Sequence, residues 1–136
     1  MKIKNEYPPV YEKICKRFGI RPVNTFYTYG DTIYNPDNLL VPDYIVVHEE
    51  VHMRQQNFTD AESWWNRYLD DVDFRIDQEA KAYAMQYDFM CKVIKDREQR
   101  LKIRNDLGKI MSGPIYNNVI SQSEATALIK KLSSVK

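Results

Sequence analysis

The sequence is poor in the residues that mark several common protein classes. Its two cysteines, Cys15 and Cys91, stand alone in dissimilar contexts, which excludes a disulfide framework and a paired-thiolate metal site. Its longest apolar runs, such as YIVV, fall far short of the roughly 20 residues that a membrane span needs, and MKIKNEYPPV has no apolar core of a secretion signal. We therefore expect a soluble, cytoplasmic protein that has reduced thiols and does not bind a membrane.

An excess of one charge is also absent. Twenty basic residues against nineteen acidic ones leave a formal net charge of +1, so no field of the whole molecule favours a nucleic-acid partner. A chain of 136 residues can bury a real core but is too short for two independent ones. We expect one domain over residues 1–136 and no nucleic-acid partner.

Histidine is equally scarce, and both copies lie in the stretch VVHEEVHMRQQ, at His48 and His52. Residues four apart on a helix share one face with their β-carbons about 5–6 Å apart, so two imidazoles can hold one ion at about 2.0–2.1 Å each. Glu49 lies about 100° further around the helix axis, beside such an ion, where its carboxylate can hold a water molecule. The pattern H-E-x-x-H therefore predicts a metal site.

A chance motif on an ordinary amphipathic helix is the alternative. The face that carries the two histidines also carries Tyr44, Ile45 and Val51, which indicates that it points inward. Unpaired imidazoles would be costly there, so burial of both favours a shared ligand.

A catalytic zinc site needs a third protein ligand, and no histidine remains to supply it. Gln55 and Phe58 stand where the metzincin form of the motif needs glycine and histidine, which excludes that form. Cys91 is less plausible because it lies on an apolar helical stripe. The remaining candidates are the downstream carboxylates of Asp60, Glu62, Asp70, Asp71, Asp73, Asp77 and Glu79.

A ligand should sit on a rigid element that faces the core, which disfavours the loop-like run LDDVD and favours the long helix predicted over residues 74–95. Glu79 has the apolar Ile76 and Tyr83 on its flank, whereas Asp77 neighbours Lys81 and is more easily read as solvated. Glu79 is therefore the first choice, with Asp77 and Asp73 behind it.

The rest of the chain predicts a mostly helical α+β domain. TFYTYGDTIYN, with a Gly30-Asp31 turn, indicates a small antiparallel hairpin before the histidine helix, which begins at Pro42-Asp43. Periodic apolar residues and capping patterns predict the other helices, which cover residues 10–18, 59–71, 74–95, 96–111 and 121–132.

HEEVH on one helix, followed 27 residues after His52 by the glutamate of DQEAKAYA on a second helix, resembles the gluzincin group of zinc metallopeptidases. The resemblance is to the small zincin-like proteins found among bacteriophage and prophage genes, and it covers roughly residues 25–90. It implies that His48, His52 and Glu79 bind Zn²⁺ and that Glu49 is the general base. It also implies that the hairpin supplies an edge strand that aligns an extended peptide substrate.

Several side chains can be interpreted either as functional or as purely structural. Tyr83 and Tyr116 could hydrogen-bond the oxyanion of a zincin-type reaction, although core packing is the commoner role of tyrosine. Gln55 and Gln56 could orient a histidine, although such glutamines more often continue a helix into solvent.

We expect a zinc-dependent metallopeptidase. The alternative from another class is a non-catalytic zinc-binding interaction or assembly module, which would have no use for the non-ligand carboxylate of Glu49. Another metal-dependent hydrolysis, such as deamidation, would use the same residues. Because 136 residues leave little for a second cleft wall, a protein partner that completes the cleft is a further expectation.

Overall fold

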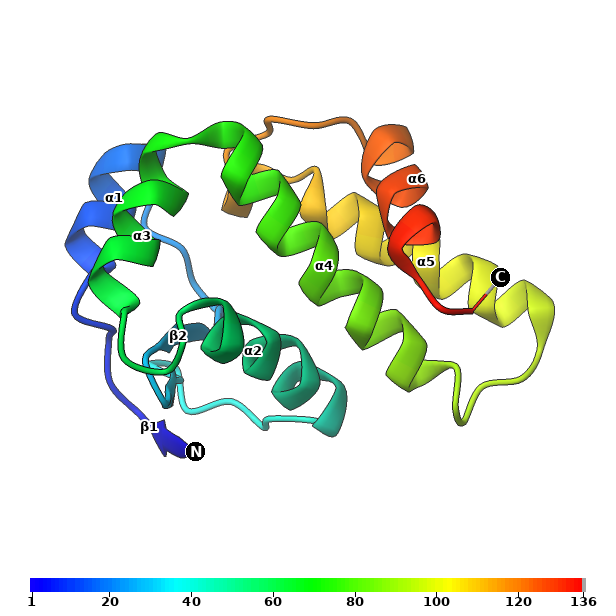
Figure 1. The fold of residues 1–136 in the computed structure, drawn as a ribbon, viewed down its shortest axis with the longest axis horizontal. Helices are drawn as coiled ribbons and strands as arrows, with labels where there is room; N and C mark the ends of the chain where they lie inside the picture. Colours follow the sequence, from blue (N-terminus) through cyan, green and yellow to red (C-terminus); the bar gives the residue numbers. More distant parts are fainter. Residues whose placement is uncertain (136) are drawn as a thin grey trace.

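The computed structural model describes residues 1–135. Helices form most of this part of the chain, and a small sheet lies near its N-terminus (Figure 1). The elements in chain order are β1 (Lys2–Lys4), α1 (Tyr11–Phe18), β2 (Tyr27–Tyr29), β3 (Thr32–Tyr34), α2 (Asp43–Gln55), α3 (Ala61–Asp70), α4 (Val72–Met90), α5 (Arg97–Met111), the 3₁₀ turn η1 (Pro114–Tyr116) and α6 (Gln122–Leu132). The prediction of a mostly helical α+β fold is thus confirmed.

Local sequence signals account for the helix ends. Gly19 ends α1 with a left-handed φ of 70° and donates its N–H to the carbonyl of Cys15. Ser121 begins α6, and the capping box that it forms with Glu124 is present. The run LDDVD, which reads as a loop in the sequence, is in fact almost wholly helical. Asp71 alone separates α3 from α4, and its carboxylate accepts the N–H of Phe74.

The predicted hairpin is present, and one further strand joins it. Gly30, with φ of 66°, lies in the turn between β2 and β3, which pair antiparallel. β1 pairs parallel with the other side of β3, so β3 is central and β2 is an edge strand. β1 was not predicted, because its three residues are all exposed and carry no apolar alternation.

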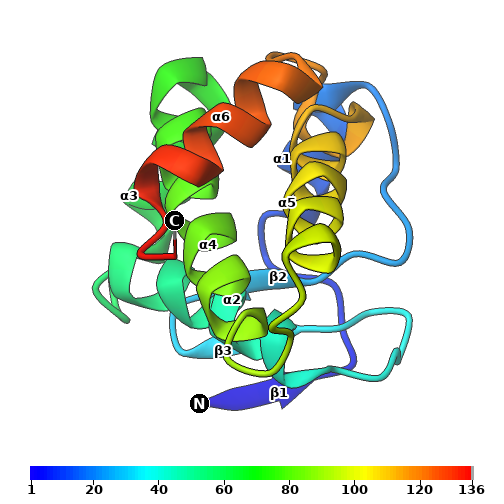
Figure 2. The ribbon, with the colours of Figure 1, turned by 90° about the vertical axis from the view of Figure 1, so that its right-hand side faces the viewer.

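Helix α4 runs between α1 and α3 on one side and α5 and α6 on the other (Figure 1). Figure 2 shows the sheet in the lower part of the molecule, where β2 lies against α2. The N-terminal cluster joins α1, α3 and the hairpin around Trp64, Trp65 and Tyr68. The C-terminal cluster joins α4, α5 and α6 around Tyr87, Leu107 and Ile129. None of the helices in residues 1–135 combines the length and apolar character that crossing a membrane requires.

Candidate metal centre

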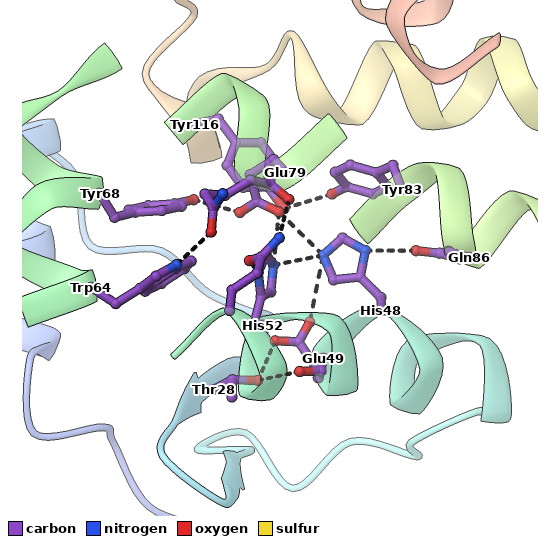
Figure 3. A network of polar contacts seen from close by, with 12 residues as sticks. Thr28, His48, Glu49, His52, Trp64, Tyr68, Glu79, Tyr83, Gln86 and Tyr116 are labelled. Atoms are coloured by element: carbon purple, nitrogen blue, oxygen red, sulfur yellow. Dashed lines mark hydrogen bonds and ion pairs between the residues drawn. The ribbon is translucent and has the colours of Figure 1, made fainter. Parts of the chain in front are cut away.

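His48 and His52 on α2 and Glu79 on α4 bring three ligand atoms together (Figure 3). The two histidine Nε2 atoms are 3.2 Å apart, and Glu79 Oε1 lies 3.2 Å from that of His48 and 3.0 Å from that of His52. Ligands that hold a tetrahedral ion at about 2.0–2.1 Å are about 3.3–3.4 Å apart. The three atoms therefore form nearly the face of a tetrahedron and can hold a metal ion.

The three ligands are buried because α2 and α4 pack against each other along their lengths. His48, His52 and Glu79 are each no more than 5 % exposed. Two imidazoles and a carboxylate are costly to bury without partners, so their convergence needs a shared cation, whether a proton or a metal ion.

A glutamine fixes the orientation of each histidine ring. Gln55 Nε2 donates to the carbonyl of Gln78, so its Oε1 is the atom that lies 2.7 Å from His52 Nδ1. That nitrogen must then carry the proton, which leaves the Nε2 lone pair free for a metal. Gln86 Oε1 lies 3.0 Å from His48 Nδ1, where it can accept a hydrogen bond from that nitrogen.

Tyr68 restricts Glu79 to one ligand oxygen. The Tyr68 hydroxyl on α3 donates to Glu79 Oε2 at 2.5 Å. Oε1 is the oxygen that faces the two histidines. The carboxylate is thus arranged to bind an ion through one oxygen while the other is held by hydrogen bonding.

The charges of the cluster depend on one another. In the metal-free protein, burial would lower the pKa of His52, but the negative charge of Glu79 and the hydrogen bond to it raise that pKa to about 9. Burial likewise opposes ionisation of Glu79, yet the facing histidines hold its pKa well below the ordinary range. A metal ion entering this site must therefore displace a proton from His52.

Glu49 lies beside the ligand atoms and not among them. Its Oε2 is 3.7 Å from His48 Nε2, and its Oε1 accepts the hydroxyl of Thr28 on β2 at 2.9 Å. Burial raises the pKa of Glu49, and His48, His52 and the Thr28 hydroxyl counteract that rise. A buried, non-ligand carboxylate with a raised pKa is suited to accept and return a proton near neutral pH.

The competing ligand candidates lie elsewhere. Asp77 is exposed and pairs with Lys81 at 2.9 Å, and Asp73 is exposed in the first turn of α4. Cys91 is buried in the C-terminal cluster. Among the candidates that the sequence leaves open, Glu79 is the one that meets both histidines.

Tyr83 and Tyr116 meet at the edge of the metal centre. Their hydroxyl oxygens are 2.6 Å apart, and the Tyr83 ring packs 4.4 Å from the His48 ring. Burial and the charge of Glu79 raise the pKa of both phenols, so both stay protonated. One proton serves the hydrogen bond within the pair, which leaves the other available to a ligand.

Two adjoining hollows reach the ligand atoms. A small cavity of about 40 Å³ is lined by His48, His52, Glu79 and Glu49 and can hold only a few water-sized groups. An outer groove of about 540 Å³ meets it at His48, Glu49 and Tyr116. Apolar residues from the segment before β2, from α2, α4, α5 and from η1 line most of the groove, namely Val23, Phe26, Ile45, Met90, Ile103, Leu107, Ile110 and Ile115.

The edge of β2 is partly closed by side chains. Gln56 Nε2 donates to the carbonyl of Thr28, and Gln56 Oε1 accepts the N–H of Gly30. Trp65 Nε1 also donates to the Thr28 carbonyl. Gln56 thus pairs with β2 as a neighbouring strand would, and the residues that line the groove next to this edge, Thr25 and Phe26, precede β2.

Several residues of this centre were missed or misread in the sequence. Gln56 is 1 % exposed, so the interpretation that it continues the helix into solvent is wrong. Thr28, Tyr68 and Gln86 were not predicted as partners of Glu49, Glu79 and His48. Gln86 lies seven residues after Glu79, two turns along the same face of α4, and this spacing was a usable signal.

Comparisons with protein-family models, with curated proteins and with solved structures found no significant match. The chemistry of the centre is therefore inferred from its own geometry.

Proposed function

We propose that this chain is a zinc-dependent peptidase of the gluzincin type, with His48, His52 and Glu79 as ligands and Glu49 as general base. One observation carries the proposal. A tetrahedral ligand face lies next to the buried carboxylate of Glu49, which is not part of the group whose ligand atoms all lie within 4.8 Å of one another and is held by its own donor, Thr28. A purely structural zinc site has no use for that carboxylate.

Zinc is the metal that suits this ligand set. Two imidazoles and one carboxylate in tetrahedral arrangement, with the fourth position open to the cavity, are typical of catalytic zinc. The ion would lower the pKa of a water molecule to about 7 and polarise a carbonyl group.

The residues of the chain carry out the proton transfers. Glu49 accepts a proton from the attacking water and returns it to the leaving amine as the C–N bond breaks. Thr28 keeps the Glu49 carboxylate aimed at the ligand face. With Tyr83 donating to Tyr116, the remaining proton of Tyr116 can hydrogen-bond the oxygen on which negative charge develops.

The groove supports an extended peptide segment as substrate. Its volume of about 540 Å³ suits a few residues, and its apolar lining favours large apolar side chains. The substrate backbone would pair with the chain at Phe26, the residue before β2, because Gln56 and Trp65 already bind the carbonyl of Thr28 within β2. α5 and η1 also line this groove, through Ile103, Leu107, Ile110 and Ile115.

The first experiment is metal analysis of purified protein by mass spectrometry. We expect about one zinc per chain in the wild type and in Glu49→Gln. We expect loss of the metal in His48→Ala and Glu79→Ala. Asp77→Ala is the matched control, since it removes a carboxylate from the same helix outside the centre, and it should keep its zinc. Absence of zinc from the wild type, even after zinc is supplied, would contradict the proposal.

Activity is tested with internally quenched peptides that carry large apolar residues. Zinc-loaded wild type should cleave them, and zinc-loaded Glu49→Gln should be slower by a factor of at least about 100. Zinc binding without turnover of any peptide would instead favour the non-catalytic zinc-binding module. Release of ammonia from glutamine-containing peptides would indicate deamidation.

A further inference from the structure

Arg75 is a buried cation close to the metal centre, and its role is not explained by an ion pair. It is 1 % exposed, and it takes part in none of the ion pairs found among residues 1–135. Its Nη1 has no hydrogen-bond partner in the same residues. An arginine is rarely buried in this way unless its position serves the surrounding structure.

The guanidinium joins the end of α3 to the start of α4. Arg75 Nε donates to the carbonyl of Tyr68 at 2.8 Å, and Nη2 donates to that of Leu69 at 2.9 Å. Both carbonyls belong to the last turn of α3, where no helical N–H follows to donate to them. A positive charge at this helix end is also favourable to the helix dipole.

The same contacts fix the phenol that holds Glu79. Arg75 Cζ lies 5.6 Å from the centre of the Tyr68 ring, so the guanidinium touches both the backbone and the side chain of that residue. Tyr68 then donates to Glu79, which lies one turn beyond Arg75 on α4. Arg75 also lines a cavity of about 10 Å³ together with Glu79, enough for about one water molecule.

We propose that Arg75 is a positioning residue of the metal centre, which acts through Tyr68 to present one oxygen of Glu79 to the ion. This inference rests on the metal site of the proposed function. Arg75 does not touch the ion or the substrate; it determines how tightly and in what geometry the ion is bound.

The test is a double-mutant cycle on metal affinity. Zinc affinity is measured by competition with a chelator for wild type, Arg75→Met, Tyr68→Phe and the double variant. We expect each single substitution to weaken binding by about 10–100-fold, as loss of an outer partner of a ligand does. The double variant should be no weaker than the weaker single variant, because both changes interrupt one path. If the fold-losses of zinc affinity in the two single variants multiply in the double variant, Arg75 acts independently of Tyr68, and the proposal is overturned.

Two controls separate positioning from general loss of stability. Arg17→Met removes another donor to the Leu69 carbonyl, for which no hydrogen bond or cation–π contact with Tyr68 is found among residues 1–135, and it should leave zinc affinity unchanged. Gly108→Ala strains the distant crossing of α5 and α6 and should lower the melting temperature without weakening zinc binding. Equal loss of affinity in Gly108→Ala and Arg75→Met would reduce Arg75 to a structural role and overturn the proposal.

A spectroscopic readout does not depend on affinity. Cobalt-loaded Arg75→Met and Tyr68→Phe should show the same altered visible absorption, since both release the second oxygen of Glu79. An unchanged cobalt spectrum in both would contradict the proposal. If Arg75→Met does not fold, Arg75→Lys keeps the charge but cannot serve both carbonyls, and it should show an intermediate effect. A wild type that binds no zinc would instead refute the proposed function.

Discussion

Gln55 determines which nitrogen of His52 carries the proton. Its amide is anchored by the carbonyl of Gln78, so only its oxygen can face His52 Nδ1, at 2.7 Å. In the neutral ring, the nitrogen on the opposite side keeps its lone pair, which a metal ion can use once the second proton has left His52. One turn of α2 supplies both a metal ligand and the group that prepares it.

Substitution of Gln55 should therefore weaken metal binding without unfolding the protein. We expect Gln55→Leu to lower zinc affinity by about 10–100-fold, because His52 loses the acceptor that fixes its tautomer and ring orientation. Chelator competition measures the change. Arg54→Leu, at the exposed neighbouring position of α2, is the control and should bind zinc as the wild type does. Equal affinities of the two variants would refute this role of Gln55.

Zinc uptake should release a proton at neutral pH. The pKa of His52 in the metal-free protein is raised to about 9, so His52 is protonated at pH 7 and must lose that proton to bind zinc. Zinc affinity should then rise about tenfold per pH unit up to about pH 9. Calorimetry in two buffers of different ionisation enthalpy measures the proton count, and a count of zero would contradict the pKa shift.

The raised pKa of His52 also affects the stability of the metal-free protein. Zinc affinity should increase with pH, whereas this stability should decrease with pH. The folded-state pKa of His52 lies above its ordinary value of 6.5, so the His52–Glu79 pair stabilises the metal-free protein fully below that pH. This contribution should be lost as the pH rises from about 6.5 through about 9. Thermal unfolding of chelator-treated protein at several pH values checks this, with His52→Ala as the control that should not show the same slope.

The Thr28 hydroxyl should set the lower pH limit of activity. It donates to Glu49 and favours the ionised carboxylate, whose pKa burial already raises. Thr28→Val removes that donor at nearly constant volume, so the pKa of Glu49 should rise further. In a plot of kcat/KM against pH, the limb on the acid side should then move to higher pH. Thr32→Val on β3, whose hydroxyl bonds Asp31, should leave the limb in place; a shift of the same size there would refute the assignment.

Close packing of α5 against α6 depends on Gly108. A Cβ at this position would lie 2.0 Å from Thr126 Oγ1 and 3.0 Å from its backbone nitrogen. We expect Gly108→Ala to reduce the free energy of unfolding by about 1–3 kcal/mol, the usual cost of overpacking. Denaturant unfolding measures the loss. Adding Thr126→Ala should recover part of it, and full additivity of the two changes would argue against a direct clash.

The sequence was most informative where chemistry and periodicity coincide. The two histidines of H-E-x-x-H and Glu79, which its flanking residues favoured over Asp77, lie together in a group that could hold a metal ion, with Glu49 beside His48. Each of these two signals lies within a single helix, the motif in α2 and the residues flanking Glu79 in α4. The hairpin was equally readable, because its turn requires the positive φ that Gly30 supplies.

The partners of the ligands could not be predicted in the same way. Thr28 reaches Glu49 from 21 residues away. The spacing of Gln86 from Glu79 indicates its face of α4, but not that this face meets His48, 38 residues before it. Helical periodicity places a residue on a face but does not say which helix that face meets. Tyr68 is an ordinary aromatic core residue in the sequence, and only the crossing of α3 and α4 turns its hydroxyl toward Glu79.

The side chain of Gln56 has a consequence beyond the metal centre. Unpaired strand edges recruit strands from other copies of a protein and so promote aggregation. Here β1 carries the exposed cations of Lys2 and Lys4 at one edge of the sheet, and Gln56 occupies the backbone groups of Thr28 and Gly30 at the other. Both edges of the sheet are therefore guarded against self-association, while Thr25 and Phe26, which precede β2, border the groove.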